Sequence, residues 1–134
     1  MGDGSGAEIA RVTFPISGDL ASLRAKVRTF LVRAEFDELT EKNFVLALSE
    51  AANNVLDHSG GTGTLTMRHL EGRVVAEIHD DAGLLIDPHA GMKQPPVGSR
   101  RGYGIWLMRT LCDSVEILHD PGGSTVRLTM LLPH

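Results

Sequence analysis

Segment 48–60, LSEAANNVLDHSG, places polar side chains at helical spacing. At about 100° per residue, four of them fall within an arc of about 100° on one side of the helix. They are Glu50, Asn54, Asp57 and His58. The segment contains no lysine or arginine to pair with them, and asparagine is a poor helix former. A carboxylate four residues before a carboxamide directs a base and a neutral oxygen ligand into the same space, which suits a magnesium ion. Taken alone, the pattern also fits a solvated helix face.

A second candidate is an aspartate at the end of an apolar strand pattern. Val74, Ala76 and Ile78 alternate along RVVAEIHD, so Asp80 shares their face. If that face packs against helices, the carboxylate points inward and needs a partner. The residues allow two roles: a cap of the following turn, or an acceptor for a ligand's amino group such as the exocyclic amine of adenine.

A third candidate is the glycine-rich segment GSRRGYGIWLMRTL, which leads into an apolar helix. Gly102 and Gly104 would let the backbone approach a ligand closely, and the N–H groups at a helix start attract anions. Arg101 adds positive charge to the same loop. The segment matches neither the P-loop pattern nor the dinucleotide G-x-G-x-x-G pattern after a strand. It indicates phosphate binding, with an ordinary flexible loop as the alternative.

The elements that position these residues follow from hydrophobic periodicity. Alternating apolar residues over 12–16 predict a strand, and Pro15 favours an edge position. Helical spacing predicts a helix over about 19–35. A second helix is predicted to begin at a Thr40 cap and to end near His58, and a third to follow the glycine-rich segment.

Four further strands are predicted in two pairs. TLTMRHL and RVVAEIHD are joined by a turn at Glu71-Gly72, and SVEILHD and STVRLTMLL by the turn PGG. Segment 82–101, between the pairs, is predicted to be a long loop of the kind that often forms a lid. This order predicts an α/β (α+β sandwich) fold, with a mixed or antiparallel sheet and helices packed on one face. We expect residues 1–10 to be a flexible lead-in and residues 11–134 to form a single domain.

The bulk composition fits a small globular protein. The 134 residues are 42% hydrophobic and carry a formal net charge of -4, which argues against binding to nucleic acid or anionic membranes. The single cysteine, Cys112, excludes an internal disulfide, fits a reducing cytoplasm and is expected to be inert in the core. No apolar run approaches the roughly 20 residues that span a bilayer. We therefore expect a cytoplasmic protein.

Taken in order, these segments resemble the GHKL ATPase superfamily, which has the Bergerat ATP-binding fold, and most closely the bacterial anti-sigma factors that are also serine kinases. SEAANNVLDH matches the N box S-E-A-x-x-N-A-x-x-H, and GYGIWLM matches G-x-G-(L/I)-x-L. DDAGL stands where the family has D-x-G-x-G, with Ala82 and Leu84 at the usual glycine positions. GGSTV is similar to the family's G-G-T-x-V. The resemblance extends from Val12 to Leu132.

The resemblance implies ATP and magnesium as cofactors. Glu50 would be the general base that activates a hydroxyl or a water, and Asn54 would hold the magnesium ion that bridges the phosphates. Gly102 and Gly104 would cradle the phosphates beneath a lid formed by residues 87–101.

The resemblance also implies the contacts to the nucleobase. Asp80 would bind the adenine amine, and Thr125 would support that contact. Arg101 is a further candidate contact to the nucleotide. His58 matches a family position, where we expect a structural hydrogen bond.

The first function that follows from the resemblance is an anti-sigma factor with ATP-dependent protein-serine kinase activity toward a small antagonist (anti-anti-sigma) protein. Such a protein regulates transcription by partner switching and would be a homodimer. The basic face of the predicted 19–35 helix is a candidate docking surface for an acidic partner, with a solvated basic face as the alternative. That face carries Arg24, Arg28 and Arg33.

A second function is a non-catalytic module of the same fold, ATP-responsive or nucleotide-free, that sequesters a partner. Ala82 and Leu84 favour this function, whereas Glu50 and Asn54 favour the kinase because binding alone does not require a base. The catalytic fragment of a histidine kinase is a less favoured third reading. Only about 18 residues precede the first predicted helix, and none resembles a dimerisation helix with a phosphoacceptor histidine.

Overall fold

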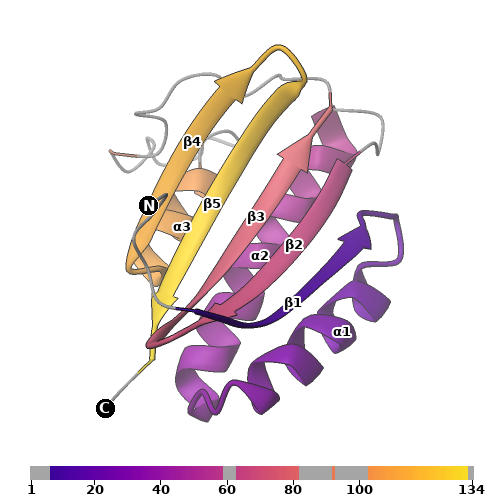
Figure 1. Ribbon diagram of the computed structural model, residues 1–134. Helices are drawn as coiled ribbons and strands as arrows, with labels where there is room; N and C mark the ends of the chain where they lie inside the picture. The colour runs from indigo at the N-terminus through magenta and orange to yellow at the C-terminus, as the bar shows by residue number, and fades with distance from the viewer. Residues whose placement is uncertain (1–6, 59–62, 82–91, 93–102, 133–134) are drawn as a thin grey trace.

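The computed structural model describes residues 7–58, 63–81, 92 and 103–132 (Figure 1). Its strands are β1 (Glu8–Pro15), β2 (Gly63–Leu70), β3 (Arg73–Asp80), β4 (Ser114–Asp120) and β5 (Gly123–Leu131). Its helices are α1 (Leu20–Arg33), α2 (Glu38–His58) and α3 (Tyr103–Leu111). All strand pairs are antiparallel, in the order β1-β2-β3-β5-β4. The helices lie on one face of this sheet (Figure 1), so the predicted fold class is confirmed.

Strand β1 forms one edge of the sheet, as Pro15 predicted, because a proline has no N–H to donate to a second neighbour. The strand begins at Glu8, earlier than expected. Residues 8–10 therefore belong to the sheet, and the predicted lead-in of residues 1–10 is too long. Pairing with β2 extends the edge strand to Glu8, opposite Leu70.

Helix α1 follows the predicted periodicity closely. Its buried face consists of Leu23, Val27, Phe30 and Leu31. The carboxylate of Asp19 caps its start by accepting a hydrogen bond from the Ser22 N–H at 3.0 Å.

Helix α2 is capped by Asp37 and not by Thr40, so the predicted cap is wrong. Oδ1 of Asp37 accepts the backbone N–H of Thr40 at 2.7 Å, which makes Asp37 the N-cap and Thr40 the third residue of the helix. The hydrogen bonds from Thr40 lower the pKa of Asp37 below its ordinary value of 3.8. Both residues can cap a helix, and the fold places the acceptor at the earlier one.

The two predicted hairpin turns are present. Gly72 has a φ of 79° in the turn between β2 and β3, a conformation that glycine adopts without steric cost. The turn between β4 and β5 lies at residues 121–122. The turns fix the register within the β2–β3 and β4–β5 pairs, and the separate pairing of β3 with β5 brings the end of β3 beside the start of β5.

The core lies between the sheet and the helices. The inner sheet face contributes a set of buried apolar side chains to it: Leu65, Met67, Val74, Ala76, Ile78, Val126, Leu128 and Met130. Cys112 is buried at the edge of the same core, and burial raises the pKa of its thiol to about 12. The thiol is therefore neutral near pH 7, as expected for an inert cysteine.

Candidate functional site

Helix α2 carries the polar stripe opposite its buried face. Its inward side chains are Val45, Leu48, Ala52 and Val55, all buried as predicted. Glu50 and Asn54 are half-buried on the other side, while Asp57 is exposed. The side chain of His58 lies outside the described residues. Among the described side chains of the stripe, Glu50 and Asn54 are therefore the ones partly withdrawn from solvent.

Gly104, in the first turn of α3, faces this pair. A methyl group placed on its Cα would stand 3.5 Å from Oε2 of Glu50 and 3.6 Å from Nδ2 of Asn54. These are ordinary van der Waals distances, so the missing side chain leaves room for an atom between the two helices. The structure therefore brings Gly104 next to Glu50 and Asn54, which lie 50 residues or more before it in the sequence.

Asp80 ends β3 on the inner face of the sheet, as predicted. Its exposed fraction is 8%, and that of Ser124, its cross-strand partner on β5, is 2%. A carboxylate and a hydroxyl thus lie side by side on the face that the helices cover. This pair can accept and donate hydrogen bonds to a polar ligand.

Thr125 does not lie beside Asp80, so the expectation that Thr125 supports the contact of Asp80 with adenine is wrong. Its hydroxyl oxygen lies 3.0 Å from Nδ1 of His79, on the opposite face of the sheet. The physical reason is the two-residue period of a strand, which turns neighbouring side chains to opposite faces. Ser124 occupies the place expected for Thr125, and the signal was available, because Ser124 aligns with the threonine of G-G-T-x-V.

A close contact near Gly63 joins these two groups of residues. A methyl group placed on Gly63 would stand 2.8 Å from Cγ1 of Val55 and 2.5 Å from the carbonyl oxygen of His79. Gly63 is therefore the point where α2, next to Asn54, meets the end of β3. In Figure 1 the ends of α2 and β3 and the turn between β4 and β5 lie at the same upper edge. No sequence signal had singled out Gly63 or His79.

Several predicted site residues lie outside the described residues. They are Arg101, Gly102, the lid segment 87–101 apart from Met92, and the altered motif positions Ala82 and Leu84.

No lysine or arginine in the described part of the chain forms an ion pair with Glu50. Its carboxylate therefore keeps its hydrogen-bonding capacity for a ligand or a water. Likewise, the described residues contain no cluster of three or more His, Cys, Asp and Glu that would hold a metal. A magnesium ion bound to phosphate oxygens requires no such cluster, because it keeps several waters and takes few protein ligands.

The family model of the histidine kinase-like ATPase domain matches residues 17–130. The chain belongs to this family. Membership confirms the resemblance to the GHKL superfamily that the motifs indicated, and ATP is the nucleotide that an ATPase domain binds. A search of the curated proteins finds no match.

Among solved structures, this histidine kinase-like ATPase domain is similar to "The crystal structure of the RsbU and RsbW domains of Rv1364c from Mycobacterium tuberculosis". The TM-score is 0.68 at 19% sequence identity, over 92% of this chain. The likeness covers 32% of the solved chain, so the present chain spans about a third of its length. At this identity the comparison shows a shared fold.

The described residues of this ATPase domain fit an adenine nucleotide. Gly104 leaves a space bordered by Glu50 and Asn54, and the buried Asp80 supplies an acceptor next to the Ser124 hydroxyl. These groups come from α2, α3, β3 and β5. None of the described helices is long and apolar enough to cross a membrane.

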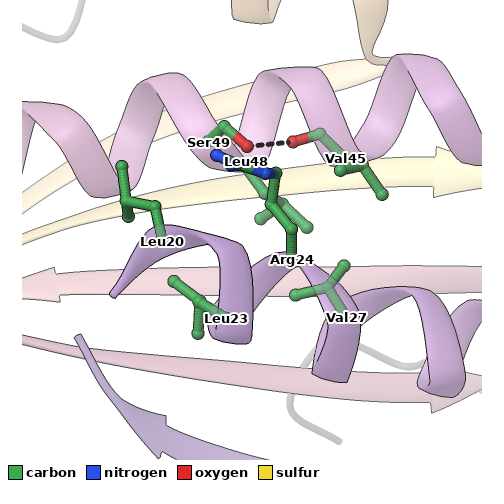
Figure 2. A pocket seen from close by; sticks show the side chains of 7 residues that line it. All are labelled: Leu20, Leu23, Arg24, Val27, Val45, Leu48 and Ser49. Atoms are coloured by element: carbon green, nitrogen blue, oxygen red, sulfur yellow. Dashed lines mark hydrogen bonds between the residues drawn. The ribbon is translucent and has the colours of Figure 1, made fainter. Parts of the chain in front are cut away.

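A shallow groove of this domain lies away from these residues, between α1 and α2 (Figure 2). Most of its lining is apolar and contributed by both helices: Leu20, Leu23, Val27, Val45 and Leu48. Arg24 reaches across from α1 toward Ser49 on α2 (Figure 2). The Ser49 hydroxyl donates to the Val45 carbonyl at 2.8 Å, as part of the helix. None of the candidate nucleotide ligands lines this groove.

Proposed function

We propose that the chain is an anti-sigma factor with ATP-dependent protein-serine kinase activity toward a small antagonist (anti-anti-sigma) protein. The observation that carries the proposal is the half-buried Glu50 carboxylate beside the Asn54 carboxamide, both facing the space at Gly104. Family membership and a fold shared with a structure that contains an RsbW domain support the anti-sigma kinase branch. Transcription would be regulated by exchange of the chain between a sigma factor and the antagonist.

The nucleotide is proposed to bind with its base toward β3 and its phosphates toward α3. The Asp80 carboxylate accepts a hydrogen bond from the adenine amine, and the neighbouring Ser124 hydroxyl supports it. Gly104 leaves space for the phosphates at the start of α3, where backbone N–H groups favour anions. By the sequence pattern alone, Gly102 is proposed to share this role. From the sequence alone, Arg101 is proposed to contact the nucleotide, and residues 87–101 are proposed to form the lid over the phosphates.

The proposed reaction is transfer of the γ-phosphoryl group of ATP to a serine hydroxyl. Bound magnesium and ATP supply charge neutralisation and the phosphoryl group. Glu50 takes the proton of the serine hydroxyl as the serine oxygen forms its bond to phosphorus. The bond from phosphorus to the β-phosphate oxygen breaks, and ADP keeps that electron pair. The carboxamide oxygen of Asn54 is the proposed ligand of magnesium.

The partner surface is proposed to include the basic face of α1. Arg28 and Arg33 are exposed, and Arg24 is half-buried at the groove between α1 and α2. Such a surface favours an acidic partner, because complementary charge speeds encounter. A cytoplasmic homodimer, with no direct contact to nucleic acid or membrane, completes the proposal by resemblance to the anti-sigma kinases.

The decisive experiment compares Glu50→Gln with the wild-type chain. We expect phosphate transfer to a candidate antagonist to fall at least about 100-fold, because the amide cannot accept the serine proton. The dissociation constant for ATP with magnesium, measured by calorimetry, should change less than about threefold, because the neutral isostere leaves the other contacts in place.

The matched control is Asp57→Asn, which removes an exposed carboxylate from the same stripe and should leave transfer unchanged. Equal transfer by the wild type and Glu50→Gln would rule out Glu50 as the base. Partner binding by a wild-type chain that transfers no phosphate would instead favour the sequestering module suggested by Ala82 and Leu84.

A further inference from the structure

The side chain of His79 lies on the sheet face that the helices leave uncovered, one residue before Asp80. Its Nδ1 lies 3.0 Å from the hydroxyl oxygen of Thr125. Its Nε2 lies 3.1 Å from the carbonyl oxygen of Gly122 and 3.3 Å from Oδ1 of Asp81. One imidazole ring thus connects the end of β3 to the turn that leads into β5.

The partners of the ring define which nitrogen carries the proton in the neutral form. The carbonyl of Gly122 can only accept, so Nε2 of His79 donates to it. Nδ1 then accepts from the hydroxyl of Thr125, which can donate. Both ring nitrogens are therefore engaged, and each one holds a different residue of the β4–β5 hairpin.

Two glycines let neighbouring strands approach the backbone of the same two residues. A methyl group on Gly63 of β2 would stand 2.5 Å from the carbonyl oxygen of His79. One on Gly123 of β5, which has a φ of 135°, would collide with the carbonyl of Asp80. The end of β3 therefore packs closely against β2 and β5, and the imidazole ring adds hydrogen bonds to Gly122 and Thr125 on the outer face.

We propose that His79 is a positioning residue for the nucleobase site, and that it acts through Asp80. The inference rests on the proposed function, in which Asp80 and Ser124 hold the adenine. Those two residues lie opposite each other across β3 and β5, and the ring ties the same two strand ends together. A hydrogen bond from the adenine amine requires the carboxylate within a few tenths of an ångström of its correct place.

The test uses His79→Asn, whose side chain is too short to reach the Gly122 carbonyl. We expect the dissociation constant for ATP with magnesium to rise roughly tenfold, the scale of one lost hydrogen bond. His79→Gln, whose amide can donate to that carbonyl, should restore affinity to within about threefold of the wild type. The control His69→Ala lies near the opposite end of β2 and should have no effect.

The double variant His79→Asn/Asp80→Asn, compared with Asp80→Asn alone, separates a positioning role of His79 from a general structural role. If His79 acts through Asp80, adding His79→Asn to Asp80→Asn should weaken ATP binding less than about twofold further. A full tenfold additional loss would overturn the inference, since it would show an effect independent of Asp80. Thermal unfolding of each variant verifies folding, and His79→Ala replaces His79→Asn if the latter does not fold.

The outcomes also distinguish this inference from the function on which it rests. Unchanged ATP affinity in His79→Asn, with affinity lost in Asp80→Asn, would overturn the role of His79 alone. Undiminished affinity in Asp80→Asn, or no ATP binding by the wild-type chain, would overturn the proposed nucleotide site and the inference with it.

Discussion

Neighbouring residues of β5 point to opposite faces of the sheet, so Ser124 and Thr125 serve different surfaces. Ser124 is buried opposite Asp80, whereas Thr125 contacts the His79 ring on the uncovered face. Both side chains carry a hydroxyl, and one step along the strand decides which of them is next to the proposed adenine contact.

A pair of hydroxyl deletions tests this assignment. Ser124→Ala should raise the dissociation constant for ATP roughly tenfold, since it removes a polar group beside Asp80. Thr125→Val should change it less than about threefold, because the bond from Nε2 of His79 to the Gly122 carbonyl remains. Calorimetric titration of both variants with ATP and magnesium measures the difference. A larger loss in Thr125→Val than in Ser124→Ala would reverse the assignment.

At the level of the elements, the start of α3 matters because Gly104 lacks a side chain that would face α2. Glycine is a poor choice for helix stability, so its presence here is consistent with a need for space beside Glu50 and Asn54. The space is open enough for a methyl group in the described structure.

Gly104→Ala should therefore separate stability from binding. We expect an unchanged or higher free energy of unfolding, by up to about 1 kcal/mol, because alanine favours the helix and meets no clash. The dissociation constant for ATP should rise at least about tenfold, because the methyl group fills the space proposed for the phosphates. Thermal unfolding and calorimetry measure the two effects. Gly18→Ala, which has open surroundings, is the control, and unimpaired ATP binding by Gly104→Ala would refute the phosphate assignment.

The start of α2 depends on Asp37. Asp37→Ala should lower Tm by roughly 2–6 °C near pH 7, since the N–H of Thr40 loses its acceptor. Asp37→Asn keeps an acceptor and should retain most of the stability. Because the pKa of Asp37 is lowered from 3.8, its charge stabilises the fold above that value, and this part is lost as pH falls through the lowered pKa.

Thermal unfolding from pH 7 down to pH 3 checks both statements. The difference between the wild type and Asp37→Asn should narrow as the solution becomes acidic. Thr40→Ala, at the position expected from the sequence to be the cap, should cost less than Asp37→Ala because its backbone N–H remains. A larger fall in Tm for Thr40→Ala than for Asp37→Ala would mean that Thr40, and not Asp37, is the N-cap of α2.

At the scale of the whole molecule, charged side chains link all five strands across the uncovered face. Glu8 pairs with Arg68 at 2.9 Å, and Glu77 pairs with Arg127 at 3.1 Å and lies 4.0 Å from Arg68. The pair Arg127–Glu116 extends the series to the other edge strand, β4, and Arg11 pairs with Glu8 within β1. Such pairs add little individually, and a connected series adds more.

The sequence predicted the layers of the fold because apolar side chains repeat with the periods of helices and strands. It also predicted that Glu50 and Asn54 share one helix face, because they are four residues apart. Their partial burial is known only from the structure. It could not reveal the contact of His79 with Gly122, because that contact depends on strand register between residues 43 positions apart. The cap at Asp37 was missed for a similar reason: Asp37 and Thr40 can both cap a helix, and only the path of the chain before α2 decides between them.

The acid sensitivity of the sheet should depend on Glu8, where β1 begins. Hydrogen bonds from Arg11, which has the larger effect, and from Arg68 lower the pKa of Glu8 below its ordinary value of 4.5. Its charge therefore stabilises the fold above pH 4.5, and that contribution is lost as pH falls through the lowered pKa. Glu8→Gln should lower Tm by roughly 1–3 °C near pH 7 at low salt.

The difference in Tm between the wild type and Glu8→Gln should shrink toward zero below about pH 3, because the wild-type carboxyl is then also neutral. It should also shrink in 1 M salt, because exposed ion pairs are screened. Thermal unfolding across pH and salt measures it, with Glu71→Gln in the exposed β2–β3 turn as the control. A Tm difference that persists unchanged in acid would mean that Glu8 contributes by packing and not by charge. In that case the ion pairs on the uncovered face would not anchor the edge strand, and the pairing of β1 with β2 would have to do so alone.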